Sequence, residues 1–120
     1  MLLEGRVERL DADVATLKVG THTLRATTRG AVAPGTSAAL FVRPERVTIA
    51  SAGNGKPGGN QVEGRLKRVS FLGSIVRYQV EVASATHVIV DVQNAGQPGL
   101  AVDMPISLGW AVEDSLVLVR

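Results

Sequence analysis

Cysteine is absent from this chain of 120 residues, and aromatic residues make up only 3% of it. The lack of cysteine excludes disulfides and thiolate metal sites, and it favours a reducing compartment. No apolar run reaches the roughly 18 residues that a membrane-spanning helix needs. The N-terminus also lacks the basic and apolar regions of a secretion signal. We therefore expect one soluble domain-sized unit, or two very small ones, held together by an ordinary core.

The formal charge is small, with 13 basic and 11 acidic residues giving +2. Such a mixed surface is not the continuous basic stripe that nucleic acids select. Few aromatic residues are available to stack on bases, and the strand pattern places two of them, Tyr78 and Trp110, among the buried residues. Nucleic acid is therefore not an expected partner, although a small barrel with a basic face remains an alternative.

Apolar and polar residues alternate along most of the chain, which is the period of a β-strand. In residues 74–82 the apolar side chains of Val76, Tyr78, Val80 and Val82 share one face. Further strands are predicted at 14–19, 22–27, 37–42, 86–92 and 105–110, separated by Gly, Pro, Asn or Asp. No segment keeps a helical period for three turns. The predicted class is all-β, with almost no helix, built as small barrels or sandwich units.

The two halves of the sequence resemble each other. Glu-Gly-Arg at positions 4–6 recurs at 63–65, and residues 37–49 match 105–118 in the order of their features. We predict two units of about five short strands, residues 1–50 and 62–120, whose terminal segments are able to exchange strands. Residues 51–61, rich in Gly and Asn, are predicted to form a linker or exposed loop.

Motifs for catalysis or metal binding are missing. Lys56 lies in a glycine-rich stretch, but Pro57 follows it and no helix is predicted there, so the stretch is not a phosphate loop. His22 and His87 occupy similar places in the two halves without accompanying carboxylates or thiolates. No serine lies in a G-x-S-x-G motif. The sequence thus predicts neither an enzyme nor a metal site.

Four motifs occur together in a fixed order. They are FVRPERVTI at 41–49, the Asn60 to Gly64 spacing, FLGS at 71–74, and LGW followed by ED and VL at 108–118. As an ordered set they resemble the TOBE (transport-associated OB) region of ABC-importer ATPase subunits of the spermidine/putrescine or ferric-iron type. The resemblance covers essentially the whole chain and implies two OB-like units.

The resemblance does not extend to the catalytic part of such subunits, because no Walker motif or LSGGQ signature occurs. It implies an excised regulatory and dimerisation domain that is not an enzyme by itself and holds no cofactor. ATP and Mg²⁺ would bind to the missing nucleotide-binding domain. The implied partners are that domain, a second copy of the full-length protein and, indirectly, the membrane subunits. The implied location is the cytoplasmic face of a bacterial inner membrane.

The resemblance also implies a role for Arg43, Pro44 and Glu45 as a structural corner. Pro44 would end the preceding strand, and the two charged residues would pair across the fold. Loss of such a pair through Arg43→Ala is then expected to cost about 1–3 kcal/mol.

A second candidate region lies in the basic stretch that follows the linker. Its residues are Arg65, Lys67, Ser70, Gly73, Ser74 and Arg77. One interpretation is a docking face for another domain. Another is an oxyanion pocket like those of related molybdate-binding domains, formed by Ser70, Gly73, Ser74 and Arg77. Those domains usually carry an S-x-R-N run, whose place Gly58-Gly59-Asn60 takes here.

Overall fold

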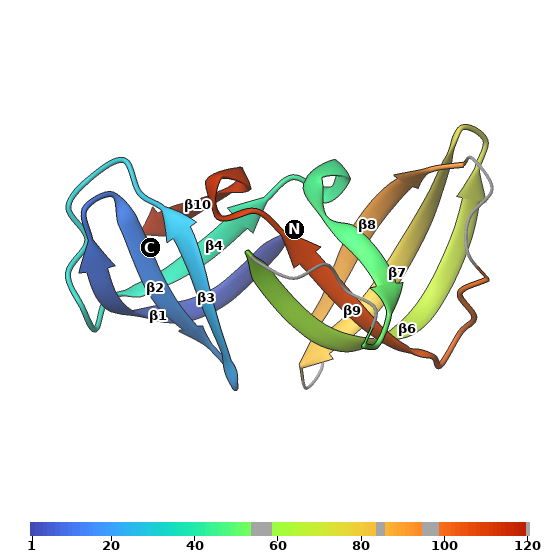
Figure 1. Cartoon of the computed structure of the whole chain (residues 1–120), viewed down its shortest axis with the longest axis horizontal. Coiled ribbons are helices and arrows are strands. Elements are labelled where there is room, and N and C mark those ends of the chain that lie inside the picture. Colours follow the sequence, from blue (N-terminus) through green and yellow to red (C-terminus); the bar gives the residue numbers. More distant parts are fainter. Residues whose placement is uncertain (54–58, 84–85, 95–98, 120) are drawn as a thin grey trace. The chain divides into compact units, whose positions relative to one another are not determined.

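A computed structural model describes residues 1–53, 59–83, 86–94 and 99–119 (Figure 1). Its elements are β1 (Leu2–Asp11), β2 (Val14–Val19), β3 (His22–Thr27), β4 (Ser37–Val42), the 3₁₀ turn η1 (Pro44–Arg46), β5 (Thr48–Ser51), β6 (Asn60–Leu72), β7 (Ile75–Ala83), β8 (Thr86–Gln93), β9 (Pro105–Trp110), η2 (Val112–Asp114) and β10 (Ser115–Val119). Over these ranges there is no α-helix, and the all-β prediction is confirmed. Residues 54–58 of the predicted linker, with Lys56, lie outside the described residues.

The strands form two units that are not consecutive halves of the chain. Unit 1 is a closed barrel in the order β1-β2-β3-β10-β4, and unit 2 is a five-stranded sheet in the order β5-β9-β6-β7-β8. Unit 1 comprises residues 1–43, 59–60 and 110–119, whereas 44–53, 61–83, 86–94 and 99–109 belong to unit 2. These bounds differ from the predicted 1–50 and 62–120 because β5 pairs with β9 and β10 pairs with β4.

The first hairpin of each unit carries the same irregularity at the same place. The register of β1 against β2 shifts between Val7 and Arg9, and that of β6 against β7 shifts between Leu66 and Arg68. The two shifts lie 59 residues apart, which is the spacing of the two Glu-Gly-Arg motifs. A bulge of this kind bends a strand and increases its twist, as barrel corners require. The units are therefore two copies of one strand arrangement.

The glycine of the repeated motif lies where two backbones cross closely. A Cβ atom on Gly5 would lie 2.5 Å from the Lys18 carbonyl oxygen, and one on Gly64 would lie 2.6 Å from that of Glu81. Both obstacles are backbone atoms of a paired strand, so neither can move aside cheaply. Any side chain at these two positions would push the first two strands of the unit apart.

The arginine of the motif holds the turn that leads into the fourth strand. Arg6 Nη1 donates a hydrogen bond to the Gly35 carbonyl oxygen at 2.7 Å, and Arg65 Nη1 donates one to the Asp103 carbonyl oxygen at 2.6 Å. Gly35 and Asp103 are counterparts, and both have positive φ angles, 89° and 74°. This hydrogen bond from the motif arginine to the turn carbonyl, called the arginine latch below, is thus present in both units. The turn residue is glycine in unit 1 and aspartate in unit 2.

The core of each unit is aliphatic. Its largest fully buried side chains are Leu3, Val7, Leu17, Leu24, Leu40 and Val42 in unit 1 and Leu66, Val76, Val80, Val90, Ile106 and Leu108 in unit 2. Tyr78 and Trp110 are 2% and 5% exposed, as their strand phase predicted. No helix within the described ranges has the length and hydropathy needed to span a membrane.

Unit 1 closes where β3 meets β10. The two strands pair in parallel at Thr27 and Leu116, and Thr27 Oγ1 donates a 2.7 Å hydrogen bond to the Ser115 carbonyl oxygen. Beside this pair, Asn60 accepts a bond from the Arg25 amide at 2.8 Å and donates one to the Arg25 carbonyl at 2.6 Å. Asn60 is 4% exposed, so its side-chain amide acts as a one-residue strand that satisfies the edge of β3.

Replacing Asn60 with alanine tests this closure. The substitution leaves the part-buried Arg25 amide without a partner, whereas the Arg25 carbonyl keeps the hydrogen bond from Ser115 Oγ at 3.1 Å, so we expect the free energy of unfolding to fall by about 1–3 kcal/mol. Asn94→Ala is the control, because Asn94 Nδ2 donates only to the Gly73 carbonyl in an exposed turn. Urea denaturation measures both variants. Equal midpoints for Asn60→Ala and wild type would contradict the proposed closure.

Gly35 and Asp103 both have a positive φ angle, so substitutions at these two positions are expected to have opposite effects on stability. Asp103→Gly relieves left-handed strain and should raise stability by about 0.5–1 kcal/mol, whereas Gly35→Ala should lower it by about 1 kcal/mol. Loss of the exposed 3.9 Å contact between Asp103 and Lys67 subtracts little from that gain. Thermal unfolding gives both values. A lower melting temperature for Asp103→Gly would show that backbone strain does not decide the effect.

Candidate functional site

Unit 2 lacks the closing contact of unit 1. Its corresponding strands, β5 and β8, stand at the two ends of the sheet order and do not pair in the described part of the chain. Counted from the register shift of the first hairpin, Val14 of unit 1 and Arg77 of unit 2 hold the same position. Thr27 lies opposite Val14 and Asp91 lies opposite Arg77, so Asp91 is the counterpart of Thr27. A carboxylate cannot donate the hydrogen bond that the Thr27 hydroxyl donates in unit 1. Unit 2 therefore lacks this hydrogen bond, and we call the unpaired edge between β5 and β8 its open seam.

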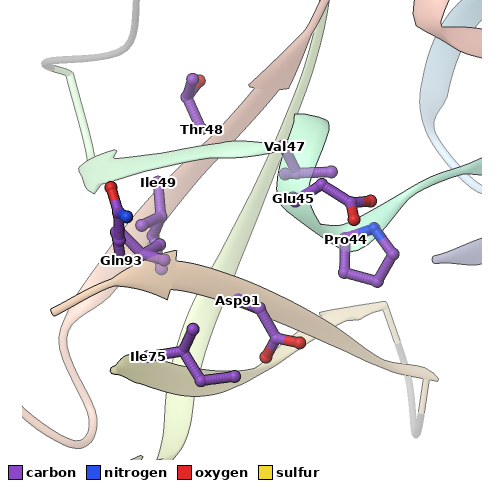
Figure 2. A pocket seen from close by; sticks show the side chains of 9 residues that line it. Pro44, Glu45, Val47, Thr48, Ile49, Ile75, Asp91 and Gln93 are labelled. Atoms are coloured by element: carbon purple, nitrogen blue, oxygen red, sulfur yellow. The ribbon is translucent and has the colours of Figure 1, made fainter. Parts of the chain in front are cut away.

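A hollow of about 870 Å³ lies at this open seam (Figure 2). It is lined by Pro44, Glu45, Val47, Thr48, Ile49, Ile75, Asp91, Val92 and Gln93. Figure 2 shows Pro44 and Glu45 on the η1 side, with Ile75 and Asp91 on the side formed by β7 and β8. All of these residues belong to unit 2, so the hollow is complete within one unit.

Two carboxylates line the hollow, but only one of them lacks a cationic neighbour in the described structure. Arg77 binds Asp91 through two hydrogen bonds, Nε to Oδ1 at 2.8 Å and Nη2 to Oδ2 at 3.0 Å. These bonds hold the pKa of Asp91 below its usual value of 3.8, against the opposing effect of partial burial. Glu45 is exposed and forms no ion pair with any described residue. The hollow therefore combines apolar walls with one unneutralised carboxylate.

The predicted corner, Arg43-Pro44-Glu45, lies at the connection from β4 to β5. Residues from Pro44 form η1, in which the Val47 amide donates to the Pro44 carbonyl oxygen at 3.3 Å. Its counterpart is η2, and in both copies the turn follows the fourth strand. Arg43 and Glu45 are exposed, and within the described ranges neither makes the cross-fold pair that the sequence suggested. The expected loss on Arg43→Ala therefore has no structural support, because an exposed unpaired guanidinium contributes little to stability.

The residues of the predicted oxyanion pocket lie on one hairpin but do not converge. Ser70 and Arg77 are cross-strand partners and line a smaller hollow of about 240 Å³ on the outer face of unit 2. Gly73 and Ser74 form the turn, and their carbonyl oxygens accept hydrogen bonds from Asn94. The guanidinium of Arg77, which was expected to bind the anion, already binds the carboxylate of Asp91.

The other two residues of that patch serve the fold. Arg65 holds the Asp103 turn through its carbonyl oxygen, and Lys67 Nζ lies 3.9 Å from the Asp103 carboxylate. The alternation pattern of the sequence indicated neither the hollow at the open seam nor the role of Asp91. Aligning β8 with β3 residue by residue would have revealed the substitution of aspartate for threonine.

The two histidines lie in different units and are not equivalent. His87 pairs with Glu81 in the register, so its counterpart is Thr23 rather than His22. His87 Nε2 lies 3.3 Å from Glu81 Oε2 on the exposed face. Among the residues described, no group of three or more potential metal ligands occurs.

Because of the Arg77–Asp91 pair, the stability difference between the wild type and Asp91→Asn is expected to depend on pH. The folded state lowers the pKa of Asp91, so the pair stabilises the fold at neutral pH and this contribution is lost as the pH falls through the folded-state value. Asp91→Asn should destabilise by about 0.5–1 kcal/mol at pH 7, since both groups are partly exposed. Urea titrations from pH 7 down to pH 2 should show this difference shrinking as the pH falls below 3.8, the usual pKa, and vanishing only below the lower folded-state pKa of Asp91. Asp11→Asn, from a more exposed pair, is the control, and a pH-independent difference would contradict the assignment.

The chain is similar in sequence to a known protein family and to a curated protein. Residues 40–118 match the family model described as TOBE domain. The spermidine/putrescine import ATP-binding protein PotA of Trichodesmium erythraeum (strain IMS101) is 34% identical over 89 residues, which are 74% of this chain and 23% of that protein. The chain thus spans about a quarter of the length of the curated relative that it matches.

Among solved structures, the cytoplasmic molybdate-binding protein ModG, crystallised with molybdate bound, superimposes with a TM-score of 0.81. It is 15% identical, and the match covers 100% of this chain and 96% of that one. This likeness identifies the fold as a pair of OB-like units. The family model matches more than half of the residues, so the chain belongs to the TOBE domain family.

Proposed function

We propose that this chain is the regulatory and dimerisation region of the ATP-binding subunit of an ABC importer. The observation that carries the proposal is the 34% identity to an import ATP-binding protein of which the chain covers only 23%. The rest of that relative has no counterpart here. The chain by itself is then non-catalytic, and the full-length protein couples ATP hydrolysis to import, with ATP and Mg²⁺ bound by its nucleotide-binding domain.

The two OB-like units support a scaffolding role. Unit 1 is a closed barrel with an aliphatic core, a buried amide and a repeated arginine latch, so it forms a rigid body against which another domain can pack. Its partners are the nucleotide-binding domain of the same protein, a second copy and, indirectly, the membrane subunits. The place of action is the cytoplasmic face of the inner membrane. A polyamine or ferric iron is the proposed cargo of the parent importer.

An oxyanion-sensing role has less support. The bound ligand of the structural neighbour is molybdate, but at 15% identity that likeness concerns the fold. Ser70 and Arg77 face each other across the hairpin, but Gly73 and Ser74 form its turn, and Arg77 is engaged by Asp91. Calorimetric titration of the chain with molybdate and sulfate separates the two functions, because the scaffolding role predicts no binding heat.

Removing this region from the full-length parent tests the leading proposal. We expect the truncated subunit to retain ATP binding, measured by calorimetry, but to form fewer dimers in light scattering at equal concentration. The isolated chain should show no ATP turnover. ATP hydrolysis by the chain alone, or unchanged dimerisation of the truncated subunit, would each contradict the proposal.

A further inference from the structure

The hollow of unit 2 has the properties of a small-molecule site. Its volume of about 870 Å³ lies in the range of roughly 300–1,000 Å³ that ligand pockets occupy. It exists because β5 and β8 leave their facing edges unpaired, whereas the corresponding strands of unit 1 are joined. The described part of the chain provides no segment that fills it. The site is thus a product of the difference between the two copies.

The walls of the hollow suit an apolar body. Val47 is buried, and Ile49, Ile75 and Val92 are half-buried along the cavity. Pro44 adds a further apolar surface at the η1 end. A bound aliphatic group would remove part of these side chains from water, which favours association in proportion to the apolar area covered. The walls therefore select a ligand with an apolar part.

The charge of the hollow selects the other part of the ligand. Glu45 contributes one carboxylate without a cationic partner in the described ranges, and the second carboxylate, Asp91, is neutralised by Arg77. The lining residues carry one net negative charge, which attracts a cation and repels an anion inside the hollow, while the exposed Arg43 and Arg46 beside Glu45 in the chain are not among them. A second or third positive charge on the ligand would find no further unpaired carboxylate on the lining. A single charge is the best match.

We propose that the open seam of unit 2 binds a small organic monocation, an ammonium group on an apolar body, with the ammonium at Glu45 and the body against Val47, Ile75 and Val92. This site is independent of the importer function proposed above. In the described part of unit 1, Thr27 and Ser115 close the corresponding seam. The two copies thereby divide the tasks of support and ligand binding.

Binding of n-pentylammonium to the ¹⁵N-labelled chain, followed by NMR, tests the site. The expected result is saturable shifts in the amides of 47–49, 75 and 91–93. Pentan-1-ol removes the charge and pentanoate reverses it, so both should bind at least about fivefold more weakly than n-pentylammonium. Shifts of equal size with pentan-1-ol, or shifts centred outside these residues, would overturn the proposal.

Paired variants and a polycation complete the test. Glu45→Gln should weaken n-pentylammonium binding about fivefold, since an exposed ion pair is lost. Glu113→Gln changes the counterpart carboxylate in η2 of unit 1 and should leave the binding unchanged. Both positions are exposed, so both variants should fold, as their NMR spectra would verify. Unaltered binding by Glu45→Gln would refute the ammonium contact. Tighter binding of spermidine than of n-pentylammonium would refute the choice of a monocation.

Discussion

The close crossing of two backbones at Gly5, repeated at Gly64, is the constraint on which both units depend. It brings the first strand of each unit against the second with no room for a side chain. The register shift two residues later and the arginine latch to the fourth strand follow from the same tripeptide.

The two units differ at one position of the third strand, which holds Thr27 in unit 1 and Asp91 in unit 2. Thr27 donates a hydrogen bond that closes unit 1, and Asn60 satisfies the neighbouring edge with its side-chain amide. Asp91 occupies the equivalent place in unit 2, and it turns to Arg77 instead. The exchange of a hydroxyl donor for a carboxylate is thus one difference between the closed barrel of unit 1 and the open, partly apolar hollow of unit 2.

Local patterns sufficed for the strands and the duplication, because alternation and the repeated Glu-Gly-Arg express side-chain direction and backbone approach directly. They did not suffice for the unit boundaries. β5 has only four residues, and its alternation is the same whichever sheet it joins, so its pairing with β9 depends on contacts distant in sequence. The hollow was missed for a similar reason, since Asp91 lies in a regular strand. The cross-fold pairing expected of Arg43 was implied by the family resemblance, and local patterns do not show that this side chain is exposed.

Amide hydrogen exchange at two equivalent residues tests the central claim most directly. Arg25 and Ile89 hold the same register position in their units, opposite Thr16 and Gln79. The Arg25 amide is bonded to Asn60, whereas the corresponding edge of β8 has no paired strand among the described residues. The account predicts that the Ile89 amide exchanges about tenfold faster than that of Arg25, or more, under native conditions. Equal protection of the two amides would contradict it.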